Sequence, residues 1–157
     1  MLTSWPVFAS SALLALLLIV GAVTDIRERV ISNRLNLAIA ISAPLYWWAT
    51  GIALWPGVGI QIGMAFVIFA VFALLFALGL MGGGDVKLLG ALALWLPWQE
   101  MGKLLVIMAI VGGVITVATL LYHKLRRRDG QPEVPYGVAI ALAGLWVLGE
   151  LNLNPFS

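Results

Sequence analysis

Six long apolar runs, separated by short polar segments, constrain the fold of this chain most strongly. They cover approximately residues 7–23, 35–50, 60–78, 86–98, 103–122 and 135–148. A helix needs about 20 apolar residues to cross the ~30 Å hydrocarbon core of a bilayer. Hydrophobic residues make up 62% of the chain and charged residues 10%, whereas a soluble domain carries roughly a quarter charged residues. The sequence therefore predicts an all-α, polytopic membrane protein with six transmembrane helices, in one domain over residues 1–157.

The charges between the runs predict which side of the membrane each loop occupies, because loops rich in lysine and arginine stay in the cytoplasm. One side of the predicted bundle receives Arg27, Arg29, Arg34, Lys87, Lys124, Arg126, Arg127 and Arg128. The opposite side receives Lys103. An aromatic belt at this opposite, outer interface is predicted from Trp5, Trp47, Trp48, Trp55, Trp95, Trp98 and Trp146. We therefore expect both termini on the outer side.

A glycine-rich segment, Gly-Leu-Met-Gly-Gly-Gly-Asp at residues 79–85, interrupts the apolar sequence before the fourth run. An ionisable group at such a place is costly, which makes Asp85 a candidate functional residue. The glycines allow the backbone to bend tightly and allow another segment to approach closely. Asp85 could instead only cap the helix that follows it.

Asp25 ends the first run, so the predicted topology places Asp25 and Asp85 on the same, cytoplasmic side. The fourth helix, with ~13 residues at ~1.5 Å each, covers about 20 Å, and its start is expected to be recessed into the membrane. Non-helical backbone at that depth needs protein or water around it. Two carboxylates that share a proton there could activate water and polarise a peptide carbonyl. Asp25 could instead only pair with Arg27 or Arg29.

Three segments resemble the type IV prepilin peptidase family. Gly82-Gly83-Gly84-Asp85 fits the Gly-x-Gly-Asp signature of membrane aspartyl proteases. The segment Asp25-Ile-Arg-Glu-Arg-Val-Ile-Ser-Asn33 is similar to the family pattern Asp-x-x-x-x-x-Ile-Pro-Asn, with Ser32 where proline is usual. Val134-Pro135-Tyr136-Gly137 resembles the Pro-Tyr-Gly segment at the family's last helix.

The resemblance implies an aspartic-type endopeptidase of the bacterial inner membrane that removes the short basic leader from type IV pilin or pilin-like precursors at the cytoplasmic side. Its catalytic pair would be Asp25 and Asp85. Residues that would bind substrate or shape the site are Gly82, Gly84, Lys87, Asn33 and Tyr136. Lys87 could instead extend to the membrane interface, and Asn33 and Tyr136 could only cap or anchor helices.

The chain contains no cysteine, whereas the long, methylating members of that family carry paired cysteines in an extra cytoplasmic region. It looks like the short form associated with tight-adherence (Flp-type) pili, and no methyltransferase activity is expected. With no cysteine and one histidine, we expect no metal and no cofactor. The expected partners are pilin precursors and membrane lipid, with no nucleic acid. The alternative is a non-enzymatic assembly subunit, or a cation or proton carrier, that uses the same aspartates.

Overall fold

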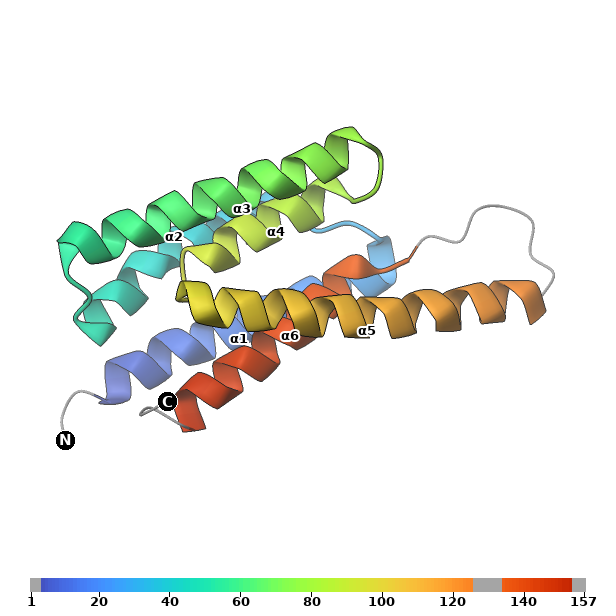
Figure 1. The fold of residues 1–157 in the computed structure, drawn as a ribbon. Helices are drawn as coiled ribbons and strands as arrows, with labels where there is room; N and C mark the ends of the chain where they lie inside the picture. Colours follow the sequence, from blue (N-terminus) through green and yellow to red (C-terminus); the bar gives the residue numbers. More distant parts are fainter. Residues whose placement is uncertain (1–3, 126–133, 154–157) are drawn as a thin grey trace.

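The computed structural model describes residues 4–125 and 134–153, which form helices and contain no β-strand (Figure 1). The helices are α1 Ser4–Glu28, α2 Asn33–Thr50, α3 Gly59–Ala77, α4 Gly83–Ala93, α5 Trp98–Leu125 and α6 Tyr136–Leu153. A short turn, η1 Leu54–Val58, precedes α3. The all-α prediction is confirmed, and each predicted apolar run forms a helix. Arg126, Arg127 and Arg128, on which part of the topology prediction rests, lie outside the described residues.

Three helices of the described chain are both long enough and apolar enough to cross a membrane. They cover Trp5–Glu28, Leu54–Ala77 and Trp98–Leu125. The apolar part of α6, Tyr136–Asn152, is shorter. These helices indicate an integral membrane protein, while the total of six spans and the side on which the termini lie remain predictions.

The short helix α4 lies inside the bundle and contacts α2, α3, α5 and α6. Its side chains Leu88, Leu89 and Leu92 are at most 1% exposed. Its 11 residues cover roughly 16 Å at about 1.5 Å per residue, about half of the ~30 Å hydrocarbon core. The helix predicted over 86–98 thus begins earlier and ends earlier. It ends before Pro97, whose ring disfavours helical backbone at the preceding residue.

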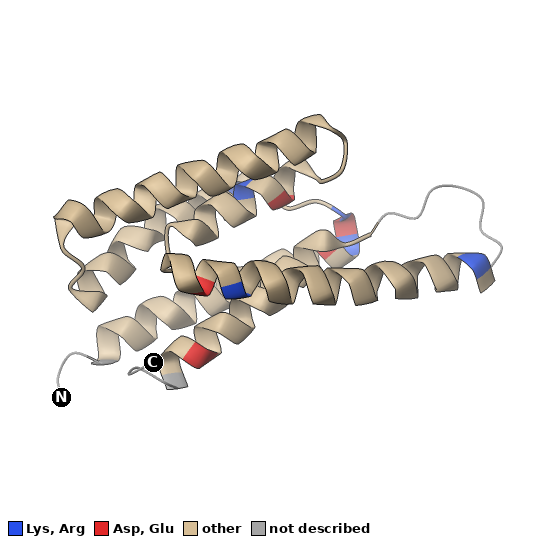
Figure 2. Ribbon diagram, viewed as in Figure 1, with Lys and Arg blue, Asp and Glu red and all other residues tan. Residues whose placement is uncertain are grey.

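The outer surfaces of the longer helices are apolar. Leu16 of α1, Phe66 of α3 and Val106 of α5 are 62%, 71% and 60% exposed. Figure 2 shows α3 and most of α1 without charged residues, and α5 carries none between Lys103 and Lys124. Long helices with uncharged, apolar outer surfaces are expected where lipid surrounds the protein. The start of α1 and the end of α6 lie at the same end of this bundle (Figure 1).

The tryptophans do not all belong to an interfacial belt. Trp95 is 1% exposed, donates its Nε1–H to the Ile39 carbonyl at 2.8 Å and packs on Tyr46 with 5.3 Å between ring centroids. Trp47 donates its Nε1–H to the Leu94 carbonyl at 2.7 Å. These two indoles therefore satisfy their N–H groups inside the bundle, which corrects the belt prediction for them. The other tryptophans are exposed: Trp5, Trp48, Trp55, Trp98 and Trp146.

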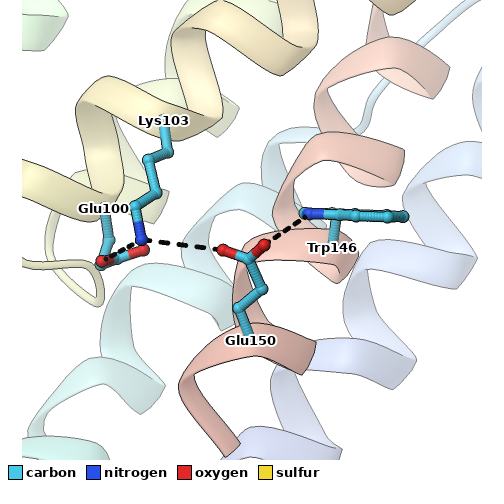
Figure 3. A network of polar contacts seen from close by, with 4 residues as sticks. All are labelled: Glu100, Lys103, Trp146 and Glu150. Atoms are coloured by element: carbon cyan, nitrogen blue, oxygen red, sulfur yellow. Dashed lines mark hydrogen bonds and ion pairs between the residues drawn. The ribbon is translucent and has the colours of Figure 1, made fainter. Parts of the chain in front are cut away.

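A polar network joins α5 to α6 at the end of the bundle opposite the first turn of α4 (Figure 3). The Lys103 ammonium lies 2.9 Å from Glu100 Oε1 and 3.7 Å from Glu150 Oε2. Glu150 also accepts the Nε1–H of Trp146 at 3.0 Å. Lys103 is about half exposed, so solvent screens these ion pairs and they contribute little to the stability of the fold.

Candidate active site

Asp25 lies in the last full turn of α1 and is 6% exposed. Its carboxylate faces the start of α6, where Oδ2 accepts the backbone N–H of Val138 at 3.0 Å. The backbone N–H of Gly137 also donates to it. The first N–H groups of a helix have no partner within that helix and stabilise a negative charge. The Asp25 carboxylate can therefore be buried here, because backbone N–H groups at the start of α6 stabilise its charge.

Asp85 is the third residue of α4, and Gly82 rather than Asp85 occupies the N-cap position. The Asp85 carboxylate folds back towards that cap, where it accepts the Gly82 backbone N–H. A methyl group on Gly82 would lie 3.0 Å from Asp85 Oδ2. Asp85 therefore both bonds the start of α4 and lines a cavity.

Asp25 and Asp85 line the same cavity. The sequence places them on the same side of the membrane but does not show that they lie close together. The cavity has a volume of about 610 Å³, and both Asp25 and Asp85 line it. They are close enough for their charges to interact. The remaining wall comes from the α1–α2 connection, the 79–84 segment and the start of α6, including Arg29 and Tyr136. The charge of Arg29 also acts on Asp25.

Ile31 separates two glycines that each adjoin one aspartate. A methyl group on Gly84 would lie 3.1 Å from both the Cβ and the carbonyl oxygen of Ile31. One on Gly137 would lie 2.5 Å from Ile31 Cδ1 and 2.8 Å from Asp25 Oδ2. Both glycines are therefore needed for the close approach of α4 and α6 to the α1–α2 connection, an approach that places Asp85 near Asp25.

The predicted site residues divide into two groups. Gly82, Gly84 and Tyr136 line the cavity with the aspartates. Lys87 and Asn33 line an apolar groove of about 550 Å³ between α2, α3 and α4. There the Lys87 ammonium donates to Asn33 Oδ1 at 2.7 Å. Lys87 thus points away from Asp85, as a spacing of two residues on a helix predicts.

Ser32 forms a regular start of α2 at the position where the family pattern has proline. Ser32 is the N-cap of α2, and its hydroxyl accepts the backbone N–H of Leu35 at 3.2 Å. Serine is among the most favourable residues at that position. The departure from the family pattern therefore leaves a well-formed helix start.

Sequence reasoning missed Asn36, although a signal for it was present. Asn36 lies one helical turn after Asn33, in the otherwise apolar stretch 35–41 of α2, where an unbonded amide is costly. Its Nδ2 donates to the carbonyl of Gly84 at 3.0 Å. The sequence pattern contains Ile31 but gives no sign of its role, because its contacts with Gly84 and Gly137 depend on the tertiary fold.

Among the described residues, no three His, Cys, Asp or Glu side chains gather in a way that could hold a metal ion. The acidic groups of the cavity are Asp25 and Asp85. Two carboxyl groups that line one cavity can accept and deliver protons, which is the chemistry of general acid–base catalysis.

Comparison with known proteins places this geometry in context. The sequence model of the type IV leader peptidase family matches residues 12–117, which include both aspartates. A prepilin leader peptidase/N-methyltransferase of Pectobacterium carotovorum is 35% identical over 75 residues, 46% of this chain and 26% of that protein. Proteins of the same description from Aeromonas salmonicida and Dickeya chrysanthemi are 37% identical over 67 residues and 36% identical over 78 residues.

The matched part of this chain spans about a quarter of the length of these relatives: 26% for the Pectobacterium protein, 22% for the Aeromonas protein and 26% for the Dickeya protein. It covers 43% of this chain in the Aeromonas comparison and 50% in the Dickeya comparison. No solved structure matches.

Proposed function

Because this chain belongs to the type IV leader peptidase family, we propose that it is a membrane aspartyl endopeptidase with Asp25 and Asp85 as its catalytic pair. The observation that carries the proposal is the single cavity lined by both carboxylates. Its volume of about 610 Å³ lies within the ~300–1,000 Å³ typical of ligand sites. Both side chains are held by backbone N–H groups, so their positions are set before a substrate arrives.

The proposed reaction is hydrolysis of one peptide bond by a water molecule between the two carboxylates. One carboxylate takes a proton from the water while the water oxygen attacks the carbonyl carbon. The other carboxyl group is protonated and donates its proton to the carbonyl oxygen. The C–N bond then breaks as the amine receives a proton, and a new carboxylate and a new amino terminus are released. A pair that shares one proton carries out both roles.

The proposed substrates are type IV pilin or pilin-like precursors, from which the short basic leader is removed. Support comes from the relatives, each of which is described as a prepilin leader peptidase/N-methyltransferase. The absence of cysteine supports the narrower proposal of a short, Flp-type enzyme without methyltransferase activity. Gly82, Gly84 and Tyr136 would shape the cavity around the peptide.

The proposed location is the bacterial inner membrane, with six spans, both termini outside and the aspartate cavity at the cytoplasmic face. Support comes from the position of the cavity, which is formed at the α1–α2 connection, where Arg29 lines it and Arg27 and Arg34 lie close by in the chain. A basic end faces the cytoplasm under the positive-inside rule. The scissile bond of a precursor would then be reached from the side on which its leader is synthesised.

Cleavage by the purified protein in detergent, with a pilin-like precursor as substrate, tests this function. Asp25→Asn and Asp85→Asn keep the size of the side chain but cannot exchange a proton, so each should lower the cleavage rate by at least about 10²–10⁴-fold. The double variant should be hardly worse than either single variant, since residues that act as a unit are not additive. Glu28→Gln, an exposed change in the same helix as Asp25, is the matched control and should cleave normally.

Chelators should leave the cleavage rate unchanged. Near-normal cleavage by either aspartate variant would refute the two-aspartate mechanism. The alternative, a cation or proton carrier, predicts instead that the wild-type protein leaves precursors intact while proteoliposomes show aspartate-dependent uptake.

A further inference from the structure

Asn36 is a buried amide in α2 that contacts the segment carrying Asp85. The residue is 5% exposed, and its Nδ2 donates to the Gly84 carbonyl oxygen at 3.0 Å. Gly84 directly precedes Asp85 in the first turn of α4. One side chain of α2 therefore holds the backbone next to a proposed catalytic carboxylate.

The first turn of α4 has few means of anchoring itself. It begins with Gly82, Gly83 and Gly84, and the N-cap Gly82 has no side chain with which to bond the turn. A turn made of glycines gains nothing from side-chain packing and loses more conformational freedom on folding than other residues do. Its position must be set by contacts from outside, and Asn36 supplies a directional one.

The other half of the Asn36 amide argues against a purely stabilising role. Asn36 Oδ1 is buried and has no hydrogen-bond partner among the described residues. A buried acceptor without a partner costs free energy, and an apolar side chain of similar size would avoid that cost. The amide is thus a poor choice for stability alone and a suitable one for holding the Gly84 carbonyl.

We propose that Asn36 is a positioning residue, which fixes the first turn of α4 and so sets the distance between Asp85 and Asp25. Its effect on cleavage rests on the function proposed above, whereas its effect on that distance does not. The nearby Lys87–Asn33 hydrogen bond also joins α4 to α2. That bond is exposed and ends on a long lysine side chain two residues past Asp85, so it constrains Asp85 less.

Cross-linking measures the distance independently of any activity. The chain contains no cysteine, so Asp25→Cys and Asp85→Cys together introduce the only two thiols. A short bifunctional thiol reagent should join them in detergent-solubilised protein. Adding Asn36→Leu should slow this cross-linking several-fold, because the turn that carries position 85 loses its bond to α2. Asn36→Asp, which has the same shape but no N–H to donate, should act in the same direction.

Ser42→Ala is the matched control for these variants. Ser42 is also buried in α2, at 7% exposed, but within the described part of the chain its hydroxyl bonds to the Ala38 and Ile39 carbonyls of its own helix and to no other helix. It should leave the cross-linking rate unchanged. Equal cross-linking with and without both Asn36 changes would overturn the proposal. If Asn36→Leu did not fold, Asn36→Asp would decide the question.

Kinetics on the otherwise wild-type chain test the consequence for cleavage. Asn36→Leu and Asn36→Asp should lower kcat by about 10–100-fold, since misplacement by ~1 Å costs about 10²-fold, while KM stays within about twofold. A residue that only stabilised the fold would lower the amount of folded protein and leave kcat per folded molecule unchanged. That result, or slower cross-linking together with normal kcat, would overturn the catalytic role. A wild-type protein that cleaves nothing would refute the proposed function and leave the cross-linking result to decide on positioning.

Discussion

Gly83 and Gly84 adjoin each other at the start of α4, but their surroundings differ. A methyl group on Gly84 would lie 3.1 Å from the carbonyl oxygen of Ile31, a backbone atom that cannot easily move. One on Gly83 would lie 3.2 Å from Cε2 of Phe76, a side chain that can shift by a few tenths of an ångström. The two neighbouring glycines therefore offer a matched pair of substitutions.

We expect Gly84→Ala to lower the cleavage rate by about 10-fold, because a backbone atom that cannot yield makes the turn that holds Asp85 move by a few tenths of an ångström, and a shift of ~1 Å can cost about 10²-fold. Gly83→Ala should lower it by only a few-fold. Both rates are measured per folded molecule, with folding followed by thermal unfolding in detergent. Equal losses for the two variants would show that the contact with Ile31 does not decide where Asp85 lies.

At the scale of single residues, the sequence predicts the charged members of the site better than their supports. Asp25 and Asp85 are prominent because a carboxylate in an apolar helical sequence is costly. Asn36 is three positions from Asn33 on one helix face, but its bond spans 48 positions along the chain. Which carbonyl it would find depends on how α4 packs, and no local pattern contains that information.

Among the elements, α4 is held near both ends by hydrogen bonds from side chains of other helices. At its start, Asn36 of α2 holds the Gly84 carbonyl. Just beyond its end, the Leu94 carbonyl accepts Trp47 Nε1–H of α2 at 2.7 Å and Gln61 Nε2–H of α3 at 3.4 Å. The last carbonyls of a helix lack partners within it, so these bonds satisfy one of them away from water.

A substitution at Trp95, two residues past the end of α4, tests how much the packing of this segment contributes to stability. Trp95→Phe removes the hydrogen bond to the Ile39 carbonyl and leaves space around a side chain that is 1% exposed. The free energy of unfolding should fall by roughly 1–3 kcal/mol, from the lost bond and the imperfectly filled space together.

Trp98→Phe is the control, because Trp98 is 61% exposed and surface changes usually stay within about ±0.5 kcal/mol. Denaturant unfolding in detergent measures both variants. If Trp98→Phe destabilised the protein as much as Trp95→Phe, the packing of Trp95 would not account for the loss.

The helices themselves were predictable from hydrophobicity. A long apolar run in lipid must hydrogen-bond its own backbone N–H and C=O groups, and a helix does this within the segment. The limits of α4 were not. Asp85 suggested a helix start at the aspartate, whereas Gly83 and Gly84 already belong to the helix. Glycine has a low intrinsic helix propensity, and here the close approach to Ile31 overrides it.

For the whole molecule, the topology is the prediction with the widest consequences. Reporter fusions at residue 33 and at residue 129, in the connection between α5 and α6, should report the cytoplasm. Fusions at residue 57 and at the C-terminus should report the outer side, because loops rich in lysine and arginine remain inside. Alkaline phosphatase and fluorescent-protein reporters give opposite signals on the two sides and control for expression. A cytoplasmic C-terminus would contradict the six-span arrangement.

Composition alone placed this chain in the membrane, and the structure agrees, with three helices long and apolar enough to cross it. The use of Trp47 and Trp95 inside the bundle was not predictable from position. A tryptophan near a helix end suits either a lipid interface or a buried hydrogen bond. Only the packing of α2 against α4 decides between these environments.

Hydrogen bonds hold α4 to α2 near both of its ends, and another holds Asp25 at the start of α6. These bonds oppose sliding of α4 along its axis and rotation about it. Under the proposed function, a bound peptide would have to adapt its own backbone to the two carboxylates. We therefore expect cleavage to favour precursors whose cleavage segment is pliable and extends readily.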